Sequence, residues 1–469
     1  MAGGDDIQGG TPVDESIDLD GRFLLPGLWD RHVHFDQWAQ MSARLDLSDT
    51  RTATAAAPLV AAHVALRDTA LDTPVVGYGF RDALWPDAPH REVLDAVSRG
   101  VPVVLISADL HSAWLNSAAL RRYGHAEHTT GLLREEAAMH VIREVGSVAD
   151  DVSDAWCRAA SRAAAARGVV GIVDMEMPWS LDAWRRRIAS GNHSLRVASS
   201  VWPERFDDAI ARQLHSGDVV HGTGGLLTVG PLKIVIDGSL NTRTAWCHDA
   251  YLLRAGGVDN FGVLVVPPDD LSQLLLRATE AGLDCAVHAI GDRANSLALQ
   301  AFARTGAHGS IEHAQLLDDD DLARFAQLGI VASVQPEHAL DDRDVADRYW
   351  GERARRAFPL RSLLNVGAVL GFGSDAPVAP LDPWLAIGAA VHRTRDERPR
   401  WHPEQEISVV EALAASMGPG RGDTSLRVGD PADLVVLDGD PYTAEPSALR
   451  TMPVAGTMLG GAWTHRAGI

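Results

Sequence analysis

The chain has 469 residues, of which 46% are hydrophobic and 22% are charged, so it is long and apolar enough to bury a large globular core. Its 42 basic and 63 acidic residues give a formal net charge of −21, which argues against binding to nucleic acid or to an anionic membrane, because both need basic patches. Three widely spaced cysteines exclude a disulfide scaffold and a zinc finger.

The N-terminal segment shows no sign of an export signal. Residues 1–16 contain neither the basic region nor the apolar region of a secretory signal. No stretch reaches the roughly 18 uninterrupted apolar residues that suggest a membrane-spanning helix. We therefore expect a cytoplasmic protein that acts on a small-molecule substrate, without nucleic-acid or membrane partners. A homo-oligomer is left open.

Short β-branched runs alternate with apolar-periodic helices over much of the chain. Most of the expected helices begin with Asp and end with Gly, which are typical cap residues; the helices are Asp269–Gly282, Asp292–Gly306, Asp320–Gly329 and Arg356–Val366. The expected strands are Phe23–His34, Val169–Met175, Leu195–Pro203, Leu232–Asp237, Asp284–Ala289, Ser310–His313, Val331–Gln335 and Val369–Asp375. Such alternation makes the strands parallel, and eight of them predict an α/β fold with a TIM-like (β/α)8 barrel.

Two regions lie outside this repeat. Residues 37–160 separate the first two strands and contain strand-like runs of their own, Pro74–Phe80 and Val101–Ala108, so we expect an inserted subdomain over the barrel mouth. Further short strands predict a small β-sandwich domain built from both termini; they are Ser16–Leu19, Leu426–Val428, Ala432–Leu437 and Val454–Leu459. The predicted division is residues 1–24 for one part of the β-sandwich, 25–405 for the barrel with its insertion, and 406–469 for a helix and the rest of the sandwich.

Lys233 is the only lysine in the chain; the remaining members of its 42 Lys and Arg residues are all arginine. It lies in the apolar run Pro231–Asp237. A buried lysine amine can lose its proton, whereas a guanidinium group cannot. A neutral amine can react with carbon dioxide to form a carbamate, an anionic oxygen ligand suited to bridging two metal ions. The alternative is a strand lysine whose ammonium group reaches solvent.

Residues that can bind a metal fall at the ends of five predicted strands; they are His32, His34, Lys233, His288, His313 and Asp375. The catalytic face of such a barrel is formed by the carboxyl ends of its strands. The two imidazoles of the His-x-His triplet point the same way, because side chains alternate with a period of two along a strand. A single histidine on an apolar strand is usually a core residue, but the convergence of all these placements on one rim favours a metal site.

Motifs along the whole chain resemble the amidohydrolase superfamily. They are Pro26–His34 (PGLWDRHVH), His111–Ser117 (HSAWLNS), Lys233–Ser239 (KIVIDGS) with Arg243-Thr-Ala, His288–Ala294 (HAIGDRA), Ile311–Ala314 (IEHA), Gly373–Pro377 (GSDAP) and Gly429–Leu437 (GDPADLVVL). The resemblance is to amidohydrolase family 3, a subgroup with a long insertion after strand one that includes N-substituted formamide deformylase and YtcJ-like proteins.

Two segments depart from this subgroup. Leu240–Arg243 reads Leu-Asn-Thr-Arg where relatives typically have Leu-Gly-Ser-Arg, and Gly79–Asp82 reads Gly-Phe-Arg-Asp where they have Gly-Trp-Asp. Both segments lie where a substrate would be held. The resemblance is therefore specific for the metal chemistry and much less specific for the substrate.

The resemblance implies a binuclear metal centre. Two zinc ions are the first expectation from the imidazole-rich ligand set, with Mn²⁺ or Fe²⁺ as alternatives. His32, His34 and Asp375 would bind the more buried ion, His288 and His313 would bind the other, and carboxylated Lys233 would bridge the two together with a hydroxide. Asp375 would accept the proton of the attacking water and pass it to the leaving nitrogen, first as general base and then as general acid.

The insertion and the segment after Lys233 supply candidate substrate contacts. His111, Trp114 and Asn116 come from the insertion, and His111 is also a candidate catalytic residue that polarises the substrate carbonyl. For Trp114, a place in the core of the subdomain is an equal alternative. Ser239 and Arg243 would line the pocket.

Three acidic residues near strand ends have structural alternatives. Asp237 could line the pocket or could end its strand in a turn. Asp174 and Glu176 could reach the rim, although a structural role is the better expectation.

The leading functional hypothesis is metal-dependent hydrolysis of a non-peptide C–N bond, in an N-acyl amine, an N-formyl amine or a cyclic amide. Alternatives are an ester or lactone hydrolase on the same centre, a non-hydrolytic lyase or isomerase, and a catalytically silent binding protein. A missing ligand would favour the last of these, but all six ligand residues are present.

Overall fold

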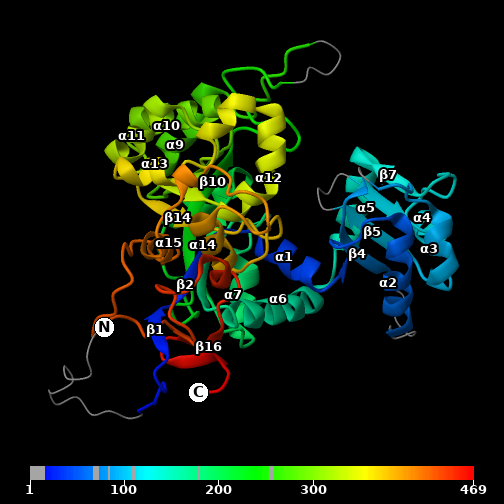
Figure 1. The fold of residues 1–469 in the computed structure, drawn as a ribbon, viewed down its shortest axis with the longest axis horizontal. Coiled ribbons are helices and arrows are strands. Elements are labelled where there is room, and N and C mark those ends of the chain that lie inside the picture. The colour runs from blue at the N-terminus through cyan, green and yellow to red at the C-terminus, as the bar shows by residue number, and fades with distance from the viewer. Residues whose placement is uncertain (1–15, 67–72, 83–84, 108–111, 178, 253–257) are drawn as a thin grey trace.

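Eight parallel strands form a closed sheet at the centre of the protein (Figure 1). The structure is a computed structural model that describes residues 16–66, 73–82, 85–107, 112–177, 179–252 and 258–469. The strands of the closed sheet are β2 (Leu28–Val33), β8 (Val169–Asp174), β9 (Arg196–Val201), β10 (Leu227–Val235), β11 (Cys285–Ala289), β12 (Gly309–His313), β13 (Val331–Val334) and β14 (Leu370–Phe372). They pair in sequence order, which confirms the predicted TIM-like barrel.

The first and last strands close the barrel. Val33 forms a parallel bridge with Ala376, just beyond β14. The backbone N–H of His34 donates to the carbonyl oxygen of Ala376 at 2.8 Å, and that of Asp375 donates to the carbonyl oxygen of His32 at 2.7 Å. These bonds join the two ends of the sheet at the edge where the candidate ligands lie.

Asp30, within β2, adds a side-chain link across the same seam. Its Oδ1 atom accepts the backbone N–H groups of His32 at 3.1 Å and Ser374 at 3.0 Å. Burial raises the pKa of Asp30 to about 6, although these hydrogen bonds favour the charged form. The carboxyl group thus holds together the segments that carry the strand-one and strand-eight ligands.

Helices cover the outside of the barrel (Figure 1). They are α6 (Asp150–Ala165), α7 (Leu181–Ala189), α8 (Phe206–Ala211), α9 (Pro268–Glu280), α10 (Asp292–Thr305), α11 (Asp319–Leu328), α12 (Pro336–Tyr349), α13 (Leu360–Asn365), α14 (Pro383–His392) and α15 (Val409–Ala415). Helices α10 and α11 end at Gly306 and Gly329, both in the left-handed conformation, as the cap pattern predicted. The helix expected at Arg356–Val366 begins later, at Leu360, because Pro359 precedes its first turn.

The insertion forms a second, mixed sheet that lies to one side of the barrel (Figure 1). Its strands are β3 (Leu45–Asp46), β4 (Val75–Phe80), β5 (Val103–Ser107), β6 (Ser112–Leu115) and β7 (Leu132–Arg134), and its helices are α2 (Ala53–Leu66), α3 (Arg91–Ser98), α4 (Ser117–Arg122) and α5 (Glu135–Gly146). Helix α1 (Phe35–Ser42) leads into this sheet from the barrel and packs against α6, which leads back. Strands β4 and β5 match the two predicted runs; the shorter strands β3, β6 and β7 were not foreseen.

Both termini contribute to a third, antiparallel sheet with the order β1-β15-β16-β17. Its strands are β1 (Phe23–Pro26), β15 (Leu434–Leu437), β16 (Val454–Leu459) and β17 (Ala462–Arg466), and the short helix α16 (Pro446–Leu449) lies between β15 and β16. The expectation of a single strand over Phe23–His34 is wrong, because the chain leaves this sheet at Gly27 and enters the barrel at Leu28. A Cβ atom on Gly27 would collide with the side chain of Val170, so only glycine fits at this crossing.

Two expected terminal strands do not form. The Ser16–Leu19 segment runs into a turn in which the N–H of Arg22 donates to the carbonyl oxygen of Leu19, with Asp20 and Gly21 at positive φ. The Leu426–Val428 segment ends in a turn closed by Asp430, and Val428 is fully exposed. In both places, local hydrogen bonds form a turn and no strand pairing is made.

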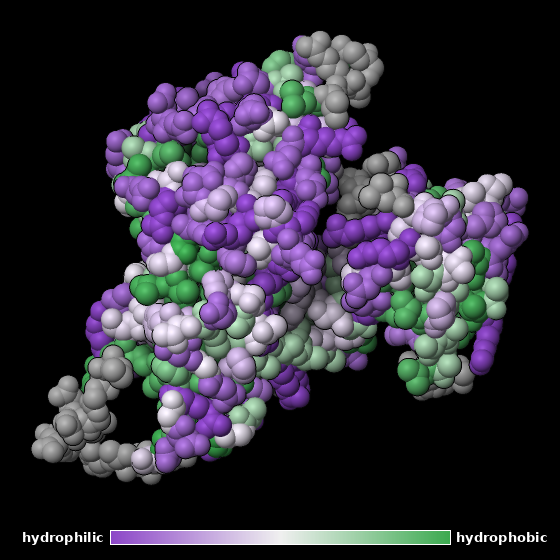
Figure 2. Space-filling view, viewed as in Figure 1, coloured by the Kyte–Doolittle hydropathy of each residue, from purple (hydrophilic) through white to green (hydrophobic). Residues whose placement is uncertain are grey.

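The surface is rich in polar residues. Hydrophilic residues cover much of the visible face, including the region of α10, α11 and α12 (Figure 2). In the described part of the chain, no helix has both the length and the apolar character needed to cross a membrane. All three cysteines are buried and unpaired.

A pair of glycines three positions apart tests how tightly the barrel is packed. Gly306 and Gly309 both have positive φ, but a Cβ atom at Gly306 meets open space, whereas at Gly309 it would collide with the carbonyl oxygen of Cys285 on β11. Replacing Gly306 by Ala should cost about 1 kcal/mol of backbone strain. Gly309→Ala should cost at least about 2 kcal/mol more, because the backbone of β12 must move. Urea unfolding of the two variants measures the difference, and equal midpoints would contradict the described packing.

Candidate metal centre

The six predicted ligand residues all lie at the carboxyl end of the barrel. His32 is on β2, and His34 comes directly after the end of β2 as the N-cap of α1. Lys233 is on β10. His288 is on β11, His313 ends β12 and Asp375 follows β14; these six residues therefore come from five of the eight strands. The register of parallel strands brings residues that are far apart in the sequence to one rim.

The side chains form a continuous cluster. Oδ1 of Asp375 lies 3.3 Å from Nε2 of His32 and 3.4 Å from Nε2 of His34. Nζ of Lys233 lies 3.5 Å from Nε2 of His32. The ring centroids of His32 and His313 are 5.1 Å apart, and those of His313 and His288 are 4.4 Å apart.

One group within this cluster is compact enough to hold an ion. Ligand atoms of His32, His313 and Asp375 all lie within 4.8 Å of one another, and all three residues are buried. The group combines two residues predicted for one metal ion with a residue predicted for the other. The two predicted ligand sets are therefore neighbours.

The donor atoms fit a divalent metal. Nδ1 of His34, Nε2 of His288 and Nδ1 of His313 are buried without a hydrogen-bond partner among the described residues. Burial, with a contribution from the Lys233 charge, lowers the pKa of His288 to about 3, and burial also holds the pKa of His313 well below its usual value. Both imidazoles are therefore neutral and offer a lone pair, the form in which histidine binds metal.

Lys233 has the environment that a reactive amine requires. It is 2% exposed, and burial lowers the pKa of its ammonium group even though the carboxylates of Glu312 and Asp375 oppose this. The alternative that the sequence left open for Lys233 was a strand lysine whose ammonium group reaches solvent. The burial of the side chain excludes it. The side chain remains inside the cluster, beside His32.

The backbone at two of the candidate ligands is in an unusual conformation. His313, Ala314 and Asp375 have φ values of 72°, 42° and 56°, which are in the left-handed region although none is glycine. Such residues cost about 1–3 kcal/mol each and cluster at functional sites. The sequence carries no signal for this, because their identities alone predict ordinary strand-end geometry.

Glu312 supports the cluster from behind and was not singled out in the sequence. Its Oε2 atom lies 2.7 Å from Nδ1 of His32, and its other oxygen accepts the hydroxyl of Ser310. Burial raises the pKa of Glu312, but the His32 hydrogen bond and charge and the Lys233 charge outweigh it and bring the value to about 2. A carboxylate in this position fixes the tautomer of a ligand histidine and leaves Nε2 available.

A comparison with known families identifies the chain. The sequence model of the amidohydrolase family known as Amidohydro_3 matches residues 15–465. The chain belongs to the amidohydrolase family. This confirms the resemblance that the motifs indicated.

Relatives in this family align over nearly the whole length of the chain. It is 28% identical to the candidate amidohydrolase YtcJ of Bacillus subtilis, and 26% identical to the N-substituted formamide deformylase of Arthrobacter pascens; each alignment covers 96% of this chain and 90% of the relative. The crystal structure of an uncharacterized metal-dependent hydrolase from Pyrococcus horikoshii OT3 has a TM-score of 0.77 at 26% identity, over 92% of this chain and 89% of that one.

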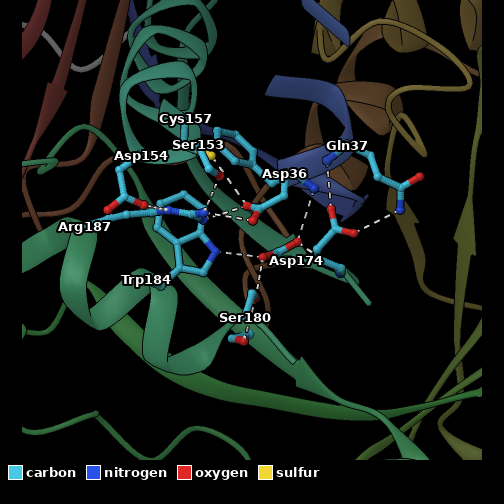
Figure 3. Close-up of polar contacts among 12 residues, drawn as sticks. Asp36, Gln37, Ser153, Asp154, Cys157, Asp174, Ser180, Trp184 and Arg187 are labelled. Carbon is cyan, nitrogen blue, oxygen red and sulfur yellow. Dashed lines mark hydrogen bonds and ion pairs between the residues drawn. The ribbon is translucent and has the colours of Figure 1, made fainter. Parts of the chain in front are cut away.

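A buried polar network holds the first turn of α1 (Figure 3). Asp174, at the end of β8, accepts the backbone N–H of Phe35 at 3.3 Å. Glu176 accepts both the backbone and the side-chain N–H groups of Gln37, each at 2.9 Å. These bonds fix the direction in which the chain leaves His34, which is the structural role favoured from the sequence for the two acids.

Arg187 on α7 completes this network (Figure 3). Its guanidinium group donates to both oxygens of Asp36, at 2.6 and 2.8 Å, and to Oδ1 of Asp154 at 2.9 Å. Arg187 is 2% exposed, so α1, α6 and α7 meet at one buried charge. The two residues before it, Arg185 and Arg186, are also arginines, and nothing in the sequence distinguished it from them.

Asp237 has a structural role at the end of β10. Its carboxylate accepts the backbone N–H groups of Trp246, Ile290 and Gly291 at 2.8–3.0 Å. Oδ1 also lies 3.5 Å from Nε2 of His288, without the geometry of a hydrogen bond. Asp237 therefore ties the loops after β10 and β11 together.

Two of the candidates from the insertion, Trp114 and Asn116, lie in the packed interior of the insertion. His111 lies outside the described residues. Trp114 is fully buried and packs on Phe80 and Trp85 in the core of the insertion. Asn116 is also fully buried, where its side chain caps α4 and bonds Val103 and Ser98. These contacts use the amide of Asn116. None of the contacts of Trp114 or Asn116 supports a substrate role, and that role stays a prediction.

The two candidates after β10 lie in a turn that they help to build. Ser239 bonds the hydroxyl of Thr242 at 2.9 Å. The guanidinium group of Arg243 lies 5.2 Å from the ring centroid of Tyr349, at the end of α12. Both residues are partly exposed, so a substrate role for them stays a prediction.

Glu312→Gln tests the role of the carboxylate behind His32. The loss of the negative charge should weaken metal binding by roughly 10- to 100-fold, because the basicity and orientation of His32 depend on it. Ser310→Ala, which removes the hydroxyl at the other oxygen, should change the affinity much less. Chelator competition measures both values. Unchanged affinity in Glu312→Gln would contradict the supporting role.

The Arg187 network can be tested against an adjacent arginine. Arg187→Met leaves Asp36 and Asp154 without their buried partner and should destabilise the protein by about 3 kcal/mol. Arg186 bonds the same Asp154, but its side chain is 41% exposed, so Arg186→Met should cost under about 1 kcal/mol. Urea unfolding compares them, and equal losses would show that burial of Arg187 is not decisive.

Proposed function

We propose that the protein is a metal-dependent hydrolase of non-peptide C–N bonds. The observation that carries the proposal is the convergence of four histidines, one aspartate and the only lysine on one rim of the barrel, where His32, Lys233, His313 and Asp375 are buried. Membership of the amidohydrolase family supports the same chemistry. The proposed substrate is an N-acyl amine, an N-formyl amine or a cyclic amide, and the similarity to an N-substituted formamide deformylase is consistent with that class.

The residues of the rim would hold two divalent ions, with zinc preferred for the imidazole-rich donor set and Mn²⁺ or Fe²⁺ as alternatives. The proposed ligands are His32, His34 and Asp375 for one ion, His288 and His313 for the other, and carboxylated Lys233 for both. Bound ions would supply acidified water, and an ion held by His288 and His313 would polarise the substrate carbonyl.

Lys233 would contribute through its neutral amine. Nζ attacks carbon dioxide, an N–C bond forms, and one proton is released to solvent, which leaves a carbamate. The low exposure of Lys233 and the absence of any other lysine in the chain support this reaction at a single position. Arginine could not replace it, because a guanidinium group keeps its proton.

Asp375 would move the proton that amide hydrolysis requires. Its Oδ1 atom lies between the imidazoles of His32 and His34, which keep the carboxylate ionised and oriented. In this role it accepts the proton of the attacking water and passes it to the leaving nitrogen. An amine leaves poorly unless it is protonated, so this relay suits an amide better than an ester.

Metal content tests the binuclear proposal. Wild-type protein purified without chelators and with bicarbonate should contain about two metal ions per chain by plasma mass spectrometry. Lys233→Arg keeps the positive charge but cannot form the carbamate, so it should lose at least one ion together with activity. His140→Gln, on the exposed side of α5, is the control. A fully metallated and active Lys233→Arg variant would refute the role of the carbamate.

Turnover of matched substrates tests the bond specificity. Formanilide and phenyl formate carry the same acyl group on nitrogen and on oxygen. The proposal expects acceleration over the uncatalysed reaction to be greater for the amide, because Asp375 can protonate its leaving group. A metal-loaded protein that accelerates only the ester would move the assignment to an esterase or lactonase.

A further inference from the structure

The seventh strand of the barrel ends beside a histidine that the proposed metal centre does not use. His338 lies in the first turn of α12, which follows β13 almost directly. Its backbone N–H donates to the carbonyl oxygen of Gln335 at 3.1 Å, and the residue is 7% exposed. Because β13 lies between the strands that lead to His313 and Asp375, His338 lies at the same end of the barrel as both.

The imidazole of His338 stacks on a candidate ligand. Its ring centroid is 6.2 Å from that of His313, and the two planes differ by 16°. Its Nε2 atom is buried and has no hydrogen-bond partner among the described residues. A buried polar atom without a partner is destabilising, and such an atom at a functional site calls for an explanation. A bound substrate would supply the missing partner.

The first turn of α12 is held rigidly. Glu337, which precedes His338 and is 5% exposed, accepts two N–H groups of Arg450 at 2.7 and 2.8 Å. It also accepts one N–H group of Arg395 at 3.0 Å. Side chains fixed by packing and by such bonds are preorganised, as a catalytic donor must be.

The next turn of α12 links His338 to both the barrel and the insertion. Oδ2 of Asp342 accepts Nε2–H of Gln315, two residues after His313, at 3.2 Å. Burial raises the pKa of Asp342, while the hydrogen bond from Gln315 and the charge of Arg81 oppose that effect. Arg81 follows β4, so the insertion approaches α12 here, and Figure 1 shows α12 on the side of the barrel that faces the insertion.

We propose that His338 is a catalytic residue whose Nε2–H donates a hydrogen bond to the carbonyl oxygen of the substrate. The inference rests on the proposed hydrolase function. The contact with His313 determines which part of the amide His338 meets, because His313 and His288 are the proposed ligands of the ion that polarises the carbonyl. The neutral imidazole carries its single proton on Nε2 in this role.

A donor placed there stabilises the carbonyl oxygen as it gains negative charge. The removal of one such donor lowers kcat by roughly 10²- to 10³-fold. The bond strengthens mainly in the transition state, so KM should change by less than about threefold. A residue that only packed against His313 would give a different result, because its loss would affect metal binding or stability.

Two substitutions separate the hydrogen bond from the packing. His338→Phe keeps a flat ring against His313 but has no donor, whereas His338→Gln loses the ring and keeps an N–H group. His140→Gln on α5 is again the control. Each variant is measured for metal content, for the midpoint of thermal unfolding, for affinity to methylphosphonate by calorimetry, and for kcat and KM on formanilide. Methylphosphonate imitates the tetrahedral oxyanion.

The proposal expects His338→Phe to keep the metal content and unfolding midpoint of the wild type. It should bind methylphosphonate at least about tenfold more weakly and lose roughly 10²-fold in kcat, and His338→Gln should recover part of both. Loss of a metal ion in both variants would overturn the substrate role and make His338 a ligand. A Phe variant with wild-type phosphonate affinity and kcat would overturn the inference alone. A wild-type protein that binds no metal would overturn the proposed function beneath it.

Discussion

The candidate centre depends on the closure of the barrel between its first and last strands. Two backbone hydrogen bonds, from the N–H of Asp375 to the carbonyl oxygen of His32 and from the N–H of His34 to the carbonyl oxygen of Ala376, bring the strand-one imidazoles within 3.3–3.4 Å of the strand-eight carboxylate. Asp30 bridges the same seam. Without this closure, residues from opposite ends of the sequence would not share a rim, and the ligands contributed by the middle strands would face only part of a site.

Burial gives these groups their chemistry. Desolvation keeps His288 and His313 neutral and lowers the pKa of the only lysine, while the carboxylate of Asp375 stays charged among imidazoles. The groups around the rim hold this arrangement in place. Glu312 orients His32, and the acids at the end of β8 fix the turn after His34. Several donor atoms that the fold leaves unpartnered are those that the proposed metal ions and substrate would satisfy.

Much of this was predictable because parallel barrels have a simple pattern. Each strand is a short apolar run, and polar residues at its carboxyl end face the active side, so the positions of His288 and His313 followed directly. The crossing at Gly27 was missed because the two strands it separates read as one apolar run. Trp114 and Asn116 belong to a motif of the family, yet both are buried, and the side chain of Asn116 caps α4. His338 was missed because it lies on a helix one turn past its strand, where a strand-end pattern gives no signal. The positive φ values of His313 and Asp375 arise from tertiary contacts.

The most direct test of the binuclear account is a crystal structure of the metal-loaded protein, grown with bicarbonate and measured on both sides of the zinc absorption edge. The account predicts two anomalous peaks, one between His32, His34 and Asp375 and the other between His288 and His313. Density for Lys233 should extend beyond Nζ by a carboxylate that contacts both peaks. A single peak beside an unmodified Lys233 would contradict it.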